Sequence, residues 1–232
     1  MNIIIKLEDI QAEILHKNIR NINLRVLPPD GKVQISAPFR TKKDTIYKFA
    51  CSKLNWIRKQ RTRISKNSYK PLQYINHESH YFRGRQYQLK VLEKKEPSNV
   101  QLINNEMVIQ VPFGADLETR SSVLKDWYHR QLEMIIPPLI AKWELILNVT
   151  VKRVSIRNMK TRWGSCTPKT RSIRFNLELV KRAPECLEYV VVHELVHLLE
   201  PSHNNKFKAL MNRFYPKWQY YKKELSSLPI KA

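Results

Sequence analysis

"VVHELVHLLEPSHN", residues 191–204, holds three of the seven histidines of this 232-residue chain. The segment is predicted to be helical, because Pro184 suits the first position of a helix and the apolar pattern stops at Pro201. At about 100° per residue, His193 and His197 point the same way, one turn apart. Two imidazoles at this spacing can hold one metal ion. The alternative is a buried helix whose histidines are satisfied by hydrogen bonds alone.

The same stretch supplies a third candidate ligand and a candidate base. His203 follows the turn expected at Pro201-Ser202, and a chain reversal there would return it toward the first two histidines. Glu194 lies at the edge of the histidine face, where its carboxylate can reach a water on the metal without being a ligand. Three protein ligands leave a fourth zinc position open, which is typical of a catalytic site. Glu200 returns to this face as a supporting residue or a rival third ligand.

Further candidate residues lie before the two histidines of the predicted helix. Tyr189 is one turn before the first of them and either packs there or stabilises developing charge. Arg162, Ser165 and Arg174 belong to a basic run and are candidates for supporting the ligands or binding substrate. Gly164 is interpreted as a turn residue.

The net charge of the chain indicates which classes of partner it can bind. The chain carries 42 Lys and Arg against 20 Asp and Glu, a net charge of +22, and neither residues 45–77 nor residues 145–177 contain an acid. Such a surface attracts anions, including nucleic acid, although a generally basic solvated surface is the alternative. No apolar run is long enough to span a bilayer and no signal peptide is recognisable, so a cytoplasmic protein is expected. Three widely spaced cysteines predict reduced thiols rather than disulfides.

Hydrophobic periodicity predicts an α+β protein. Alternating apolar and polar residues indicate short strands in the first 40 residues and again between residues 80 and 111. Between these groups, residues 41–65 have apolar positions at helical spacing and a basic opposite face, which predicts one amphipathic helix. Two later strands are expected at residues 149–159 and 171–181.

The composition changes near residue 115. A long helix is expected over residues 118–147, and Pro137-Pro138 should kink or split it. We therefore expect two domains. Residues 1–115 would form an N-terminal β-rich basic domain with one amphipathic helix, and residues 116–232 would form a second domain that carries the histidines.

Several motifs occur together in the second half of the chain. They are Arg162-Trp163-Gly164-Ser165-Cys166, the strand that ends at Asn176, His193, Glu194, His197, His203 and Phe207. This combination resembles the YgjP-like family of predicted zinc-dependent hydrolases, which is related to SprT-like and gluzincin-type metallopeptidases. The resemblance implies a small metallopeptidase-like (zincin) domain in which the HExxH helix packs on a small mixed sheet. It also implies His193, His197 and His203 as ligands of one Zn²⁺ ion and Glu194 as general base.

The favoured function is a zinc metallopeptidase that uses a metal-bound water activated by Glu194. The basic surface would recruit anionic or nucleic-acid-associated protein substrates. The strand "RSIRFN", residues 171–176, would pair with an extended peptide. Other divalent transition metals can replace zinc at three imidazoles.

Two alternative functions are also compatible with the sequence. In the first, the same site is a nucleotide pyrophosphatase or phosphohydrolase, with Arg162, Lys169, Arg171 and Arg174 holding phosphates. The chain has no P-loop and no carboxylate cluster suited to Mg²⁺, which counts against it. In the second, the chain is a basic nucleic-acid-binding protein with a non-catalytic metal site, and the helix around Trp56 contacts the nucleic acid. The sequence indicates no oligomeric state.

Overall fold

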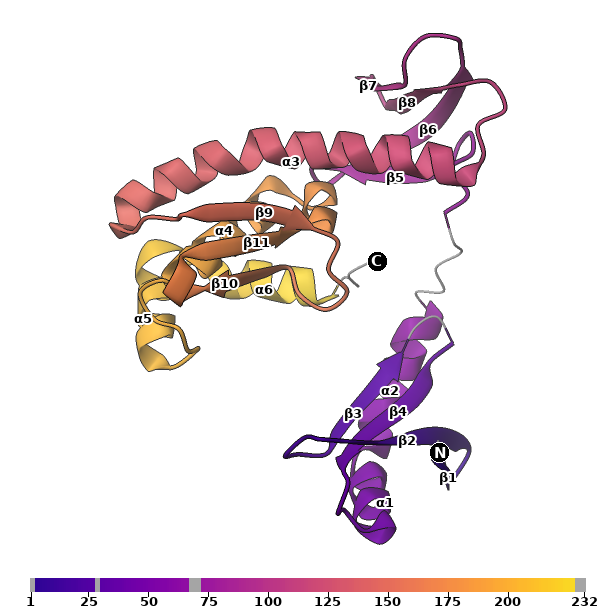
Figure 1. Cartoon of the computed structure of the whole chain (residues 1–232), viewed down its shortest axis with the longest axis vertical. Coiled ribbons are helices and arrows are strands. Elements are labelled where there is room, and N and C mark those ends of the chain that lie inside the picture. Colours follow the sequence, from indigo (N-terminus) through magenta and orange to yellow (C-terminus); the bar gives the residue numbers. More distant parts are fainter. Residues whose placement is uncertain (1–2, 28–29, 67–71, 228–232) are drawn as a thin grey trace. The chain divides into compact units, whose positions relative to one another are not determined.

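Two separate hydrophobic cores divide the chain into two units, Met1–Pro71 and Leu72–Ala232. The boundary expected near residue 115 lies inside the second unit, because the long helix after that point packs on strands before it. The α+β class is confirmed, since the described residues form three small mixed sheets and six α-helices (Figure 1). The residues that this computed structural model describes are 3–27, 30–66 and 72–227.

The first unit is a four-stranded sheet with two helices. Its elements are β1 (Ile3–Leu7), β2 (Ile10–Lys17), β3 (Asn23–Leu27), β4 (Lys32–Pro38), α1 (Lys43–Ser52) and α2 (Leu54–Lys66). The strand order is β1-β2-β4-β3, with β2 and β4 parallel and the other pairs antiparallel. Alternate residues of β2 and β4 are buried against Ile46 and Ala50 of α1 and Ile57 of α2. The single helix expected here is interrupted at Lys53.

The second unit begins with another four-stranded sheet and a long helix. These elements are β5 (Ser79–Phe82), β6 (Arg85–Glu93), β7 (Asn99–Ile103), β8 (Glu106–Val111) and α3 (Leu117–Leu147). The strand order is β5-β6-β8-β7, and α3 contacts β7 and β8. None of the helices in the described part of the chain is both long and apolar enough to cross a membrane.

Helix α3 is not split at its two prolines. Pro137 and Pro138 lie inside one continuous helix of 31 residues, whereas the sequence predicted a kink or a break. Both prolines are exposed, and the carbonyls that lose a helical partner belong to the exposed residues Glu133 and Met134, where water can replace the missing N–H. Buried apolar residues before and after the prolines, including Ile136, hold the helix on the core.

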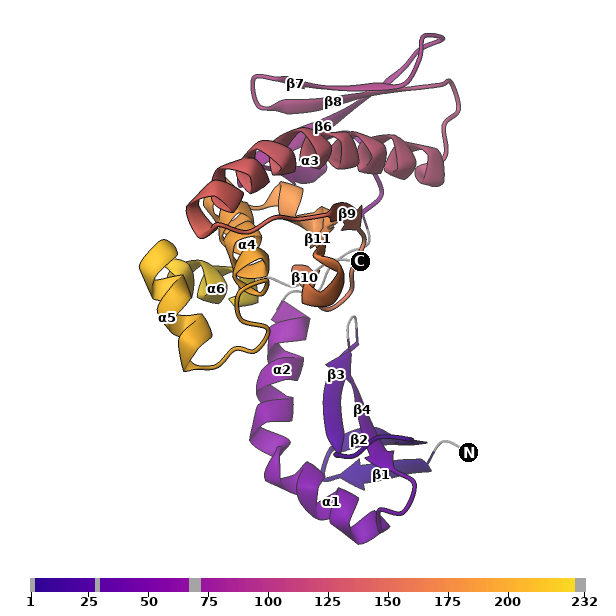
Figure 2. The same ribbon diagram turned by 60° about the vertical axis from the view of Figure 1, so that its left-hand side comes forward.

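The remaining elements surround a central helix. They are β9 (Arg153–Arg157), β10 (Gly164–Thr167), β11 (Ser172–Asn176), α4 (Pro184–Val196), α5 (Asn205–Phe214) and α6 (Trp218–Ser227), with short 3₁₀ segments η1 (Pro168–Thr170) and η2 (Leu177–Lys181). The sheet order is β10-β11-β9, so β11 is the middle strand. Helix α4 contacts α3, α5, α6 and β10, and Figure 2 shows it between these elements. Because it is enclosed, α4 is buried on nearly every side rather than on one apolar face.

Candidate metal centre

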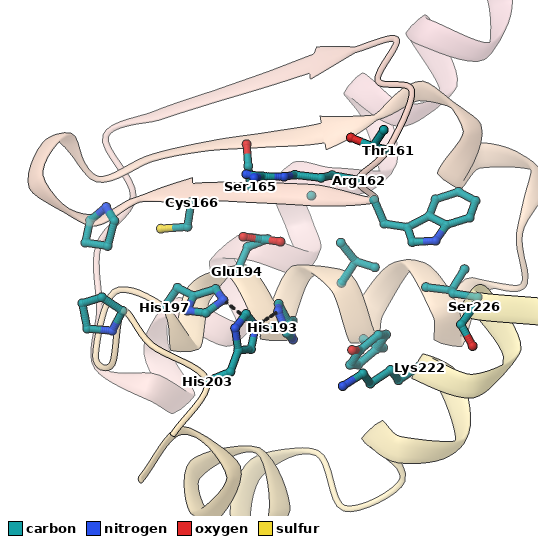
Figure 3. Close-up of a pocket in the computed structure, with 17 residues that line it drawn as sticks. Thr161, Arg162, Ser165, Cys166, His193, Glu194, His197, His203, Lys222 and Ser226 are labelled. Carbon is teal, nitrogen blue, oxygen red and sulfur yellow. Dashed lines mark hydrogen bonds between the residues drawn. The ribbon is translucent and has the colours of Figure 1, made fainter. Parts of the chain in front are cut away.

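Three imidazoles converge on one point beside α4. The Nε2 atom of His203 lies 3.0 Å from Nε2 of His193 and 3.2 Å from Nε2 of His197 (Figure 3). The candidate ligand atoms of all three residues lie within 4.8 Å of one another. Zn–N bonds of 2.0–2.1 Å at tetrahedral angles place ligand nitrogens about 3.4 Å apart. The imidazoles are therefore arranged so that they could hold one metal ion.

Local chain geometry explains the convergence. His193 lies in the last turn of α4, and His197 is the residue that follows the helix, with φ −65° and ψ −17°, so its backbone still continues the helical turn. The chain then reverses, and Asn204 caps α5 by accepting a hydrogen bond from the N–H of Phe207 at 3.0 Å. This reversal returns His203 to the other two histidines, as the sequence predicted.

Phe207 forms the support beneath the imidazoles. Its ring is only 1% exposed, and its centroid lies 4.9 Å from that of His193, 4.7 Å from that of His197 and 4.8 Å from that of His203. One buried ring in contact with all three imidazoles restricts their rotation. Phe207 belongs to the motifs that resemble the family, but the sequence alone indicates no role for it.

The protonation state suits metal binding. Nδ1 of His197 lies 3.1 Å from the carbonyl oxygen of Glu200, so an Nδ1–H would donate there and leave the Nε2 lone pair directed at the other imidazoles. Burial, with the neighbouring His197 and His203, lowers the pKa of His193 to about 3. Neutral imidazole is the form that binds a metal, so this set of donors fits one.

Glu194 is the only acidic side chain among the residues that line the cavity at this site. It is 5% exposed, and burial raises its pKa to about 8, while the nearby Arg162 charge acts in the opposite direction. Gly164 makes room for this carboxylate. A Cβ atom at Gly164 would lie 2.5 Å from Oε1 of Glu194 and 2.8 Å from its Cγ. The sequence predicted a turn at Gly164, but this residue lies in strand β10. The absence of a side chain at Gly164 allows the Glu194 carboxylate to approach the strand closely.

The centre opens into a cavity of about 840 Å³. Strand β10 forms one wall and α6 contributes to another, with the histidines and Glu194 between them (Figure 3). Among the described strands, β10 is paired only with β11, so its second edge is free on the cavity side. The sequence predicted that the strand at residues 171–176 would pair with a peptide substrate. This prediction is wrong, because β11 lies in this segment and is already paired on both edges, with β10 and with β9.

Among the other candidate residues from the sequence, some line the cavity and one does not. Arg162 and Ser165 line the cavity. Tyr189 also lines it but is 5% exposed, and its ring packs edge-on against His193 with centroids 5.7 Å apart. Arg174 does not line the cavity. It is exposed between the buried residues Ile173 and Phe175, so alternation along β11 places its side chain on the face of the sheet opposite to those two residues.

Glu200 is not among the converging groups. Its Oε1 atom accepts hydrogen bonds from the backbone N–H of Ser202 at 3.4 Å and from the hydroxyl of the same residue at 3.0 Å. Its Oε2 atom lies 3.8 Å from Nζ of Lys206. The carboxylate therefore stabilises the turn that carries His203, and only the Glu200 carbonyl contacts a histidine.

Asn176 organises the loop before β10. It is fully buried, and its Nδ2 donates to the carbonyl oxygens of Met159 at 2.7 Å and Arg162 at 2.8 Å. Its Oδ1 accepts from the N–H of Glu178 at 3.2 Å. These bonds fix the backbone of Arg162, whose residue lines the cavity. The sequence signal was a single polar residue at the end of a buried strand.

Three converging imidazoles, a buried glutamate and a free strand edge meet at one cavity, which is the arrangement expected of a metal-dependent hydrolase. The family model described as "YgjP-like, metallopeptidase domain" matches residues 20–228. The chain therefore belongs to the YgjP-like family.

Two solved structures illustrate its likeness to known proteins. The metallopeptidase zymogen of Pyrococcus abyssi abylysin is 20% identical, with a TM-score of 0.36, over 38% of this chain and 89% of that one. The metallopeptidase zymogen of Methanocaldococcus jannaschii jannalysin is 24% identical, with a TM-score of 0.35, over 39% of this chain and 92% of that one. No curated protein matches the chain.

Proposed function

We propose that this chain is a zinc-dependent metallopeptidase in which His193, His197 and His203 bind the metal and Glu194 is the general base. The observation that carries the proposal is the convergence of three Nε2 atoms beside a buried carboxylate. Membership of a metallopeptidase family supports it. The donor set favours zinc, and cobalt, nickel or manganese could bind the same nitrogens.

Each residue of the site has a separate role in the proposed hydrolysis. A zinc ion held by the three imidazoles would supply Lewis acidity for the scissile carbonyl and for an attacking water. Glu194 accepts the proton of that water and later delivers it to the leaving amine. Its burial keeps bulk water from competing for the proton. Arg162 lines the cavity near this carboxylate, and we assign it to substrate binding.

The free edge of β10 supports a peptide substrate. An extended peptide can add to an exposed strand edge through backbone hydrogen bonds. Gly164 and Cys166 of β10 lie close to Glu194, so a peptide on this edge would pass beside the base. Strand addition requires no particular side chain, which leaves sequence preference to the rest of the cavity.

The two alternatives from the sequence are not supported. Of the four cations expected to hold phosphates, only Arg162 lines the cavity, while Lys169, Arg171 and Arg174 do not. No observation at the metal centre favours a nucleotide over a peptide. The basic helix around Trp56 belongs to the first unit, whereas the converging histidines belong to the second.

Replacing Glu194 by Gln tests the proposal. The isosteric amide keeps the packing but cannot accept a proton, so turnover should fall by about 10²–10⁴-fold. Zinc content, measured by mass spectrometry of the metal, should be unchanged because Glu194 is not a ligand. The assay is cleavage of an unfolded protein and of fluorogenic peptides.

Glu185→Gln is the matched control, since Glu185 is an exposed acid of the same helix and does not line the cavity. It should retain both zinc and activity. Full turnover by Glu194→Gln would show that the assigned base is wrong. Zinc retained by His203→Ala at the affinity of the parent protein would show that the ligand set is wrong.

A further inference from the structure

Two cations flank the candidate cavity from different walls. Figure 3 shows Arg162 on the side of strand β10 and Lys222 on the side of α6, with the histidines and Glu194 between them. Lys222 was not singled out by the sequence, because its helix lies about 20 residues beyond the last histidine and has no motif. The cavity thus has two positive side chains and one buried acid.

Lys222 has no acidic partner within the described part of the chain. Its Nζ lies 5.5 Å from the centroid of the Trp218 ring. Trp218 is itself buried, so this contact holds the ammonium group near a fixed surface. Lys222 lines the same cavity as His193 and His203, which places it on the same side of the molecule as the candidate ligands (Figure 3).

The charge of the cavity therefore selects among substrates. Glu194 is buried and adjoins Arg162, so it does not neutralise Lys222 on the opposite wall. A metal ion between the histidines would add further positive charge. A cationic side chain next to Lys222 would meet like charge, whereas a carboxylate there could pair with an ammonium group that makes no ion pair with the described residues.

Building on the proposed peptidase function, we propose that Lys222 forms a carboxylate-binding subsite, so that the preferred substrates are peptides with a carboxylate beside the scissile bond. That carboxylate belongs either to an Asp or Glu side chain or to the C-terminus of the peptide. Lys222 is a specificity-determining residue in this proposal, and Glu194 and the histidines perform the chemistry.

Peptide binding to zinc-loaded Glu194→Gln protein tests the subsite without requiring turnover. Three fluorescent octapeptides are compared by anisotropy. The first has a central Glu and an amidated C-terminus, the second has Gln in its place and the same amide, and the third has Gln and a free C-terminal carboxylate. One of the two carboxylate peptides should bind about tenfold more tightly than the Gln amide, and which one does identifies the source of the carboxylate.

Lys222→Glu should abolish this preference, because it replaces the cation by a like charge. Lys223→Glu is the matched control: it is the next residue of α6, is exposed, changes the net charge equally and does not line the cavity. It should retain the preference within about twofold. Lys222→Gln should give an intermediate loss. Thermal unfolding of each variant checks that the fold is intact.

The outcomes separate the subsite from the peptidase function. Equal binding of the three peptides, absence of binding, or a preference that survives Lys222→Glu overturns the subsite. Cleavage of the Gln amide peptide as fast as the carboxylate peptides by the unsubstituted protein also overturns it, while the peptidase function stands. Carboxylate preference without cleavage of any peptide supports the subsite and contradicts the peptidase function.

Discussion

Gly164 shows how the centre depends on the absence of a side chain. Glu194 points from α4 toward β10, and its carboxylate lies so close to the strand that a Cβ atom at position 164 would clash with it. The backbone of Gly164 is not in the left-handed region. Its requirement is therefore steric, and it concerns the base rather than a turn.

Gly164→Ala should displace the Glu194 carboxylate while leaving the histidines in place. A displacement of about 1 Å at a reacting group can cost about 10²-fold in rate, so kcat/KM should fall by that order while zinc affinity is retained. Steady-state kinetics and metal titration measure the two effects.

Gly114→Ala is the contrasting variant. Gly114 has φ +69°, and a Cβ atom there would contact nothing within 4 Å. Alanine should therefore reduce the free energy of unfolding by about 1–2 kcal/mol through backbone strain and leave kcat/KM unchanged. Unaltered activity in Gly164→Ala would contradict the steric role.

At the scale of elements, the helix and the loop before β10 are positioned by different kinds of contact. Helix α4 is held by apolar packing with α3, α6 and the sheet. The loop that carries Arg162 is held by hydrogen bonds from one buried amide, that of Asn176. The position of α4 should tolerate a small change in one packing residue. The position of the loop should depend on the single side chain of Asn176.

Asn176→Ala should release this loop. The carbonyls of Met159 and Arg162 would lose their donor, at a cost of about 1–3 kcal/mol for each group left without a partner. Urea unfolding should show this loss, and KM should rise because Arg162 is no longer held at the cavity. Asn158→Ala, at an exposed position in the same loop, should change stability by less than about 0.5 kcal/mol. Equal stabilities of the two variants would contradict the role of Asn176.

At the scale of the whole molecule, the candidate metal centre belongs to one of two cores. The buried residues around β1 to β4 form a cluster of their own, and the three histidines pack on Phe207, which belongs to the core of the second unit. A ligand that binds only the folded second unit stabilises that unit by mass action.

Calorimetry with and without zinc should therefore resolve two unfolding transitions, of which only one responds to metal. At a zinc concentration a thousandfold above Kd, the responding unit should gain about 4 kcal/mol, and a chelator should remove this gain. In His203→Ala, zinc should shift neither transition by that amount. An equal shift of both transitions in the parent protein would contradict the assignment of the metal to one unit.

The secondary structure was predictable where its signal is local. The histidine pair follows from helical periodicity, and the alternation in β4 reports burial on one face. The predicted secondary structure was wrong where contacts between distant segments decide it. It broke α3 at prolines that solvent exposure tolerates, and it extended α4 beyond Val196.

The sequence by itself determined the chemistry available: two histidines one helical turn apart, a glutamate between them, a third histidine after a turn, and a large excess of positive charge. These depend on residue type and short-range backbone geometry. Only the tertiary structure decided that Gly164 receives Glu194, that β10 rather than β11 has the free edge, and that Lys222 reaches the cavity. Each of these joins residues from separate elements, and their proximity arises from the packing of those elements around α4.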